Sequence, residues 1–268
     1  MSNIKPQSKF VKVNSINMHY LEWGEASAPD VVLIHGWSGS ALSLSHVAEQ
    51  IQEQYHVIAP DHRGHGDSDK PETGYRLRDF VEDIHQLIGK LGLRRPLYAG
   101  NSWGGCIGTV MAADYPKDIS KAFLGDPVYW GMMNAFVTNL PIVLNRRKLS
   151  DEELITEMRQ QGMSQEGIID ARLASIRKFS EQALTHLLTD NRNFALECES
   201  LLRRIQVPTV IVAADPAAGG FILREESDYL ERIASPMVRF SRWEGVGHGV
   251  SNTQPERYVR EMLAFFQE

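Results

Sequence analysis

Hydrophobic positions along the chain follow two patterns, and the first is typical of β-strands. Short runs of apolar and β-branched residues, with few polar residues between them, indicate strands that are buried on both faces of a sheet. Such strands are expected at 30–36, 55–61, 96–102, 120–126 and 207–215. Strands in which apolar and polar residues alternate are expected at 9–15, 16–24 and 237–245. The first two of these should form an opening hairpin.

The second pattern is typical of amphipathic helices. In residues 77–91, Phe80, Ile84, Leu87 and Leu91 recur at spacings of three and four, which places them on one helix face. Further helices are expected at 104–115, 221–234 and 255–266. Because strands and helices alternate, we expect an α/β fold with a mostly parallel sheet and helices on both of its faces.

One segment, residues 127–205, interrupts this alternation because it contains no convincing strand. The four residues from Ser150 form a capping box at the start of one helix, and 165–191 has the pattern of a longer helix. We therefore expect residues 1–126 and 206–268 to form the core domain. The segment between them should form an all-helical cap over the strand ends, where insertions commonly shape a binding site.

Composition and charge exclude several classes of protein. The 268 residues are 43% hydrophobic and 23% charged, which is typical of a globular chain rather than a disordered one. The net charge of −6 argues against nucleic-acid binding, because such proteins usually present a basic field. The two cysteines, Cys106 and Cys198, form neither a disulfide framework nor a paired metal motif.

The chain also lacks the usual signals of secretion and membrane insertion. Residues 1–10 are polar and contain no apolar segment of the kind found in a signal peptide. No run approaches the roughly 18 apolar residues that a membrane-spanning helix needs. We expect a cytoplasmic monomer or homodimer that acts on a small molecule, with no nucleic-acid or membrane partner and no cofactor.

A candidate nucleophile lies between one predicted strand and the helix that follows it. Gly100, Ser102 and Gly104 form a G-x-S-x-G motif at this junction. A sharp strand-to-helix turn holds such a serine in a strained conformation, and small neighbours let the two elements pack closely. The Ser102 hydroxyl would then face outward at the edge of the sheet, beside a helix N-terminus that favours negative charge. Ser102 is therefore the predicted nucleophile, and a simple tight turn is the alternative.

Two further segments could complete a catalytic site. His248, flanked by glycines between the last strand and the last helix, could accept the proton of Ser102. A turn histidine that bonds only to the backbone is the alternative. The backbone N–H groups of Trp37 and Trp103 could form a two-donor oxyanion hole. His35 is expected to pack within its loop rather than to act in catalysis.

The segment 61–68 contains two histidines and two aspartates and could suggest a metal site. Its glycines make it a turn, and no strand or helix would direct its side chains to one point. The sequence also has no phosphate-binding glycine loop and no dinucleotide fingerprint. We therefore expect no metal ion in the site.

Four motifs together resemble a known family. They are HGW at 35–37, DHRGHGDS at 61–68, GNSWGG at 100–105 and GVGHG at 245–249. In this order they resemble the α/β-hydrolase superfamily, and the resemblance covers about residues 10–266. It implies an eight-stranded sheet, a helical cap at 127–205 and a catalytic triad of serine, acid and histidine. The substrate does not follow from the resemblance, because this fold supports many reactions.

The acid of the triad is the point at which the chain departs from the commonest family pattern. Most members carry it a few residues into the loop after the strand at 207–215, where this chain has alanine and glycine. Asp215 stands earlier, at the end of that strand. Asp126 ends the preceding strand, from which some dehalogenases and lactone hydrolases of the superfamily take their acid. We expect Asp126 to orient His248, with Asp215 as the alternative.

The expected reaction is acyl transfer to water. Ser102 would attack a carbonyl, His248 would take its proton and later activate water, and Asp126 would hold the imidazole tautomer. Serine at the turn argues against a dehalogenase or an epoxide hydrolase, which need a carboxylate nucleophile. Aromatic and thioether side chains at the start of the cap predict a pocket for an apolar or aromatic ester or lactone. The expected pocket residues are Tyr129, Trp130, Met133 and Phe136.

Two other functions remain as alternatives. The sequence GNSWGG is similar to the GNSMGG of hydrolases that cleave carbon–carbon bonds in ring-cleavage products, but those enzymes keep the usual late acid. The other alternative is a ligand receptor that retains a slow triad, as some plant hormone receptors of this fold do.

Overall fold

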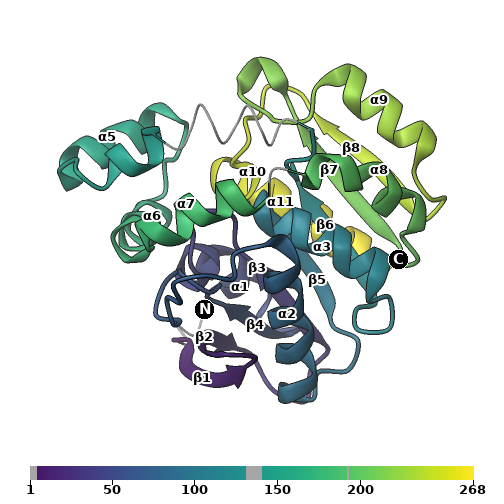
Figure 1. Ribbon diagram of the computed structural model, residues 1–268, viewed down its shortest axis with the longest axis horizontal. Helices are drawn as coiled ribbons and strands as arrows, with labels where there is room; N and C mark the ends of the chain where they lie inside the picture. Colours follow the sequence, from purple (N-terminus) through teal and green to yellow (C-terminus); the bar gives the residue numbers. More distant parts are fainter. Residues whose placement is uncertain (1–4, 131–140, 192) are drawn as a thin grey trace.

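The computed structural model describes residues 5–130, 141–191 and 193–268 (Figure 1). At its centre is an eight-stranded sheet in the order β1-β2-β4-β3-β5-β6-β7-β8. The strands are β1 (Gln7–Val13), β2 (Ile16–Trp23), β3 (Asp30–Ile34), β4 (His56–Pro60), β5 (Leu97–Asn101), β6 (Lys121–Gly125), β7 (Thr209–Ala214) and β8 (Val238–Trp243). The pairs β1–β2 and β2–β4 are antiparallel, and the remaining neighbours are parallel. The predicted mostly parallel, eight-stranded sheet is confirmed.

Helices cover both faces of this sheet. On one face, α2 (Leu77–Leu91), α3 (Trp103–Asp114), α8 (Phe194–Arg204) and α9 (Arg224–Ile233) share a hydrophobic core with the strands. On the other face, α1 (Ser45–Ile51) and α11 (Pro255–Gln267) share a second core. None of the helices in the described ranges combines the length and the apolar character that crossing a membrane would require.

Strand β3 illustrates why the apolar runs form central strands. Successive side chains of a strand point to opposite faces of the sheet. Val32 and Ile34 accordingly belong to the core under α2 and α3, whereas Val31 and Leu33 belong to the core under α1 and α11. A strand covered by helices on both faces therefore needs an unbroken apolar run.

The described residues between β6 and β7 contain helices and no strand. Helix α5 (Asp151–Gln160) begins after Ser150, whose hydroxyl accepts a hydrogen bond from the Glu153 N–H at 3.2 Å, as a capping box requires. At the other end of this segment, α8 packs against α3 and α9. The last part of the segment expected to form the cap thus packs on helices that cover the sheet.

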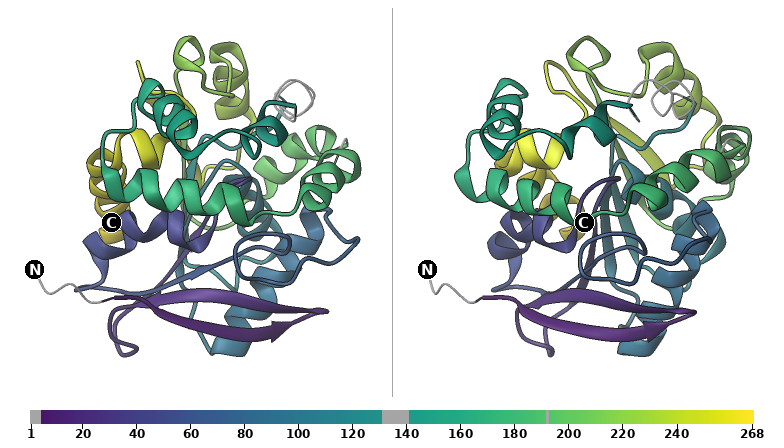
Figure 2. Two further views of the ribbon diagram at one scale, coloured as in Figure 1. Left: turned by 90° about the vertical axis from the view of Figure 1, so that its left-hand side faces the viewer. Right: turned by 60° about the vertical axis from the view of Figure 1, so that its left-hand side comes forward.

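The stretch predicted as one helix at 165–191 forms two, α6 (Glu166–Lys178) and α7 (Glu181–Asp190). The chain leaves the helical path at Ser180, whose N–H donates to the Gly64 carbonyl at 2.9 Å and whose hydroxyl accepts from the Ala183 N–H. Apolar spacing alone does not reveal such an N-cap. Helix α6 packs against α1 and the 3₁₀ helix η1 (Ala41–Leu44). In both views of Figure 2, α5, α6 and α7 lie above the β1–β2 hairpin.

Two short elements follow β7 and β8. The 3₁₀ helix η2 (Pro216–Ala218) follows β7, and α10 (Val250–Thr253) follows the loop after β8. Both therefore stand at the edge of the sheet where the parallel strands end. In folds of this kind, ligands bind at that edge.

Candidate active site

Ser102 lies in the turn between β5 and α3. Its φ of 57° and ψ of −116° fall outside the regions that non-glycine residues usually adopt, so its backbone is strained. Its N–H donates to the Gly125 carbonyl at 2.7 Å, which ties the turn to β6. A Cβ atom on Gly104 would lie 2.3 Å from the Ile34 carbonyl oxygen, so glycine is needed for α3 to pack this close to β3. The chain thus makes the strand–turn–helix corner expected from the motif.

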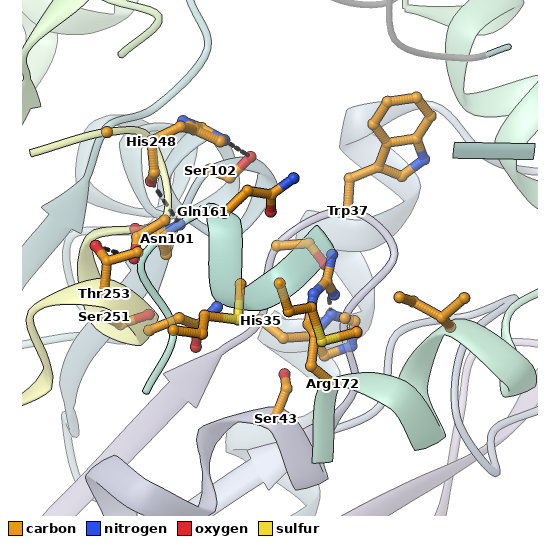
Figure 3. Close-up of a pocket in the computed structure, with 18 of the residues that line it drawn as sticks. His35, Trp37, Ser43, Asn101, Ser102, Gln161, Arg172, His248, Ser251 and Thr253 are labelled. Carbon is orange, nitrogen blue, oxygen red and sulfur yellow. Dashed lines mark hydrogen bonds between the residues drawn. The ribbon is translucent and has the colours of Figure 1, made fainter. Parts of the chain in front are cut away.

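The corner brings Ser102 to His248. The loop after β8 places His248 Nε2 2.8 Å from Ser102 Oγ (Figure 3). The other ring nitrogen, Nδ1, lies 2.6 Å from Oδ2 of Asp126, which follows β6. The carboxyl ends of these parallel strands meet at one edge of the sheet, so three distant residues form one hydrogen-bonded chain.

The Asp126 carboxylate is fully buried and is held by backbone donors. Its Oδ1 accepts a hydrogen bond from the Ala214 N–H at 3.1 Å, and its Oδ2 accepts one from the Phe221 N–H at 3.0 Å. The Phe221 ring also packs edge-on against the His248 ring, with centroids 4.3 Å apart. These contacts satisfy the buried carboxylate and fix the orientation of both partners.

The alternative acid, Asp215, has a different set of partners. Its carboxylate accepts hydrogen bonds from the Gly245 N–H at 2.8 Å and the Ala217 N–H at 2.9 Å, and these bonds lower its pKa. Asp215 therefore caps η2 and links the loops after β7 and β8. The structure brings Asp126, and not Asp215, to the imidazole of His248.

Two backbone segments flank Ser102 where an oxyanion would form. Trp103 follows Ser102 directly as the first residue of α3, and its ring packs edge-on against Phe80 in the core, with centroids 5.5 Å apart. On the other side, a Cβ atom on Gly36 would lie 3.1 Å from Ser102 Cβ and 3.6 Å from Ser102 Oγ. Trp37, the next residue, lines the cavity in front of the serine. Of the two residues predicted to form the oxyanion hole, Trp103 thus adjoins Ser102 in the chain, and Trp37 lines the cavity next to Gly36.

Comparison with known proteins places this fold in a family. A family model described as the alpha/beta hydrolase fold matches residues 29–167, more than half of the chain. The chain belongs to the α/β-hydrolase fold family. The superfamily that the four sequence motifs resemble is thereby confirmed.

Known members of the α/β-hydrolase family differ in their reactions. The chain is 27% identical to Lipase 1 of Psychrobacter immobilis, over 86% of this chain and 74% of that protein. It is 36% identical to a soluble epoxide hydrolase of Corynebacterium sp. (strain C12), over 43% of this chain and 40% of that protein. Among solved structures, E-2-(acetamidomethylene)succinate hydrolase matches with a TM-score of 0.84 and 20% identity, over 98% of this chain and 100% of that chain. The last match shows a shared fold.

In this α/β-hydrolase the Ser102–His248 pair borders a cavity of about 420 Å³ (Figure 3). A cavity of this size suits a small molecule. Part of its lining is apolar and comes from α5, α6 and the turn between them. These side chains are Leu154, Met158, Met163 and Ile176. The charged residues of the lining are Arg146, Glu157 and Arg172.

The predicted pocket residues Tyr129 and Trp130 do not line this cavity. Tyr129 is buried beside α3, where its hydroxyl oxygen lies 2.9 Å from Thr109 Oγ1. Trp130 is 37% exposed, and its backbone N–H donates to Glu226 of α9 at 3.1 Å. The chain after β6 thus passes along α3 toward α9, which directs these two side chains away from the cavity. Two other predicted pocket residues, Met133 and Phe136, lie outside the described residues.

The segment 61–68 is organised around the Asp61 carboxylate. It accepts hydrogen bonds from the backbone of Ala41 and Asp67 at 2.6 and 2.8 Å, and it lies 2.7 Å from His19 Nδ1. Burial raises the pKa of Asp61, but the bond to His19 and the other contacts outweigh it and lower the value to about 2. Within the described residues, the one group that could hold a metal ion is His19, Asp61 and Asp67. Asp67 also pairs with Lys178 at 2.8 Å, so all three side chains have protein partners.

Three histidines beside this segment are buried against one another. The ring centroid of His35 lies 4.2 Å from that of His62 and 5.3 Å from that of His65. Burial lowers the pKa of His35 to about 4 and that of His65 to about 3, and it holds the pKa of His62 well below its usual value. The His35 Nε2 atom accepts a hydrogen bond from the His62 backbone N–H at 3.1 Å. Burial therefore favours the neutral form of all three rings.

Proposed function

We propose that this protein is a serine hydrolase that cleaves a carboxylic ester or a lactone through an acyl-enzyme. The observation that carries the proposal is the hydrogen-bonded chain of Ser102, His248 and Asp126 at the edge of a small cavity. The similarity to a lipase over most of this chain supports an ester or lactone as the substrate.

The reaction begins with proton transfer from Ser102. Its hydroxyl donates to His248 Nε2, so the imidazole can take the proton while Oγ attacks the substrate carbonyl. Asp126 accepts the Nδ1–H of His248, which fixes the required tautomer and stabilises the imidazolium. His248 then returns the proton to the leaving alcohol, and the acyl group stays on Ser102.

The negative charge that develops on the carbonyl oxygen needs donors fixed in advance. The backbone N–H groups of Trp37 and Trp103 would supply them, each worth about 3 kcal/mol of transition-state stabilisation. The N-terminus of α3, which begins at Trp103, adds a favourable dipole. In the second half of the reaction, His248 takes a proton from water, which attacks the acyl carbon and releases the acid product.

Epoxide hydrolases are also among the relatives, but the nucleophile argues against that reaction here. Attack of Ser102 on an epoxide would form an ether, which has no carbonyl for water to attack. A carboxylate nucleophile would form an ester that water can hydrolyse. Serine as the nucleophile therefore favours a substrate that contains a carbonyl group.

A substrate screen tests the proposal. The purified protein would be assayed with p-nitrophenyl esters of increasing acyl length and with a set of lactones, and Ser102→Ala would serve as the blank. We expect hydrolysis in at least one class, a loss of several orders of magnitude in Ser102→Ala, and labelling of Ser102 by a fluorophosphonate. Cleavage of a dienoate but of no ester would favour carbon–carbon hydrolysis instead. Ligand-induced thermal stabilisation without any turnover would favour a receptor.

A further inference from the structure

Arg172 of α6 presents a guanidinium to the cavity without a carboxylate partner among the described residues. It donates from Nη1 to the Ser38 carbonyl oxygen at 2.7 Å and from Nη2 to the Ser38 hydroxyl at 3.0 Å. A guanidinium has five N–H donors, and these two hydrogen bonds leave three of them without an acceptor among the described residues. Figure 3 shows Arg172 and the Ser102–His248 pair at different sides of the same cavity.

The other charged residues of the lining neutralise each other. Arg146 Nε donates to both carboxylate oxygens of Glu157, at 3.0 and 3.1 Å. Glu157 is the one acidic residue among those that line the cavity. Two other cations of α6 do have carboxylate partners, both outside the cavity. Arg177 pairs with Asp151, and Lys178 pairs with Asp67. Among the described residues, the cavity lining therefore carries one cation, Arg172, that forms no ion pair with a carboxylate.

The position of Arg172 makes this unbalanced charge unfavourable in the absence of a ligand. Its partial burial and the nearby charge of Arg146 lower its pKa to about 10, although Glu157 opposes the shift. Arg172 is thus still cationic at pH 7. A cation that has lost part of its hydration needs an anion or strong acceptors to recover the free energy. The planar guanidinium fork matches the two oxygens of a carboxylate.

We propose that Arg172 binds a carboxylate group of the substrate, which is then a small anionic ester or lactone rather than a neutral one. This inference rests on the proposed function, because the scissile carbonyl must reach Ser102 while the carboxylate reaches Arg172. The apolar side chains of Leu154, Met158 and Ile176 would contact the carbon skeleton between these two ends. The volume of about 420 Å³ limits this skeleton to a small molecule.

A pair of substrates that differ only in charge tests the inference. The half-ester mono-p-nitrophenyl adipate carries a terminal carboxylate, and its terminal-amide analogue has nearly the same shape without the charge. After correction for the uncatalysed rates, we expect the wild type to favour the anion in kcat/KM by about 10- to 100-fold, as for a hydrogen bond to a charged group. Arg172→Gln should reduce this ratio to near one, and Arg172→Lys should keep part of it.

Two control variants separate recognition from a structural role. Ser38→Ala removes one hydrogen bond that anchors Arg172 but keeps the guanidinium, so the anion preference should persist. Arg159→Gln removes a cation of α5 that pairs with Glu166 at the surface, and it should leave the ratio unchanged. An equal loss for both substrates in Arg172→Gln would mean that Arg172 only tethers α6, and it would overturn the inference.

A binding measurement keeps the inference testable even if no ester is hydrolysed. Calorimetric titration of the wild type with glutarate should give measurable binding that Arg172→Gln abolishes and Arg159→Gln retains. Hydrolysis of neutral esters in a Ser102-dependent manner, with no anion preference and no glutarate binding, would support the proposed function and reject this inference. Glutarate binding at Arg172 without any Ser102-dependent hydrolysis would reject the proposed function instead.

Discussion

The Nδ1 atom of His248 lies 2.6 Å from Oδ2 of Asp126, which stands 122 positions earlier in the chain. Most members of the superfamily that the motifs resemble carry the acid in the loop after β7. Here the end of β7 and the loop after it contribute backbone donors instead, because the N–H groups of Ala214 and Phe221 bind the Asp126 carboxylate. The loop after β7 thus supports an acid that comes from the end of β6.

This arrangement predicts a large effect of Asp126→Asn on catalysis. The amide cannot hold the Nδ1–H tautomer of His248 as the carboxylate does, so kcat should fall by about 10⁴-fold, as it does when other triads lose their acid. The measurement is kcat for the best ester or lactone found in the substrate screen. Because Asn fits the same space, circular dichroism of the variant should match that of the wild type.

The matched control is Asp215→Asn. Asp215 binds the backbone of Gly245 and Ala217 and does not contact His248. We expect kcat within a few-fold of the wild type and a small decrease in Tm, because the loop loses a charge-assisted cap. If Asp215→Asn abolished activity while Asp126→Asn kept it, the assignment of the acid would be refuted.

A second prediction concerns Gly104, in the turn between β5 and α3 that holds Ser102. In Gly104→Ala the new Cβ would meet the Ile34 carbonyl oxygen at 2.3 Å, so α3 would have to move away from β3 and Ser102 would move with it. We expect a loss of both Tm and activity. Gly89→Ala is the control, because Gly89 lies inside α2 and a Cβ there would meet no atom within 4 Å other than its chain neighbours and the backbone of its own helix. That substitution should stabilise the protein by about 0.5–1 kcal/mol without changing kcat.

The sequence predicts the central sheet and the corner well because local patterns determine them. An unbroken apolar run such as 30–34 can be buried only between two helical layers, and β3 is buried in this way. The G-x-S-x-G motif is local as well, since its glycines fit a turn whose geometry depends on adjacent residues. The position of Asp126 at a strand end is also visible in the sequence, once the sheet order is known.

The cavity lining could not be predicted in the same way. Tyr129 and Trp130 have the chemistry of pocket residues, but the chain after β6 runs along α3, and only the tertiary structure determines that direction. Conversely, Arg172 and Gln161 resemble exposed polar residues of a helical segment, yet they line the cavity. Phe221, which packs on His248, lies in a loop without a motif.

A third prediction concerns the buried ion pair of Arg63 and Asp83. The Nε and Nη2 atoms of Arg63 donate to the two Asp83 oxygens at 2.7 and 2.6 Å, and Asn14 donates to the same carboxylate at 2.7 Å. Asp83→Ala would leave a guanidinium buried without its partner, so the free energy of unfolding should fall by about 3–5 kcal/mol. Urea unfolding followed by circular dichroism measures this loss.

The exposed pair of Arg159 and Glu166 provides the comparison for that experiment. Both side chains are more than half exposed, so Arg159→Gln should change the free energy of unfolding by less than about 0.5 kcal/mol. A similar small effect of Asp83→Ala would mean that Arg63 finds another acceptor, and the buried pair would then have no special role in stability.

The last prediction follows from the three buried histidines. In the unfolded chain each should titrate near 6.5, whereas in the fold the pKa is about 4 for His35, about 3 for His65 and well below 6.5 for His62. Between pH 6.5 and 4 the unfolded state therefore binds more protons than the folded state. The contribution of these neutral histidines to the free energy of unfolding is therefore fully present above pH 6.5. It decreases as the pH falls, by up to about 1.4 kcal/mol per pH unit for each histidine.

Urea unfolding at pH values from 8 to 5 measures this dependence. Asp61, whose pKa is lowered from 3.8 to about 2, adds its own loss only below about pH 4, so the histidines should dominate the slope in this range. His65→Gln removes one titrating group and should reduce the slope, even if the variant is less stable at pH 8. A free energy of unfolding that stayed constant from pH 8 to 5 would contradict neutral burial of the three rings.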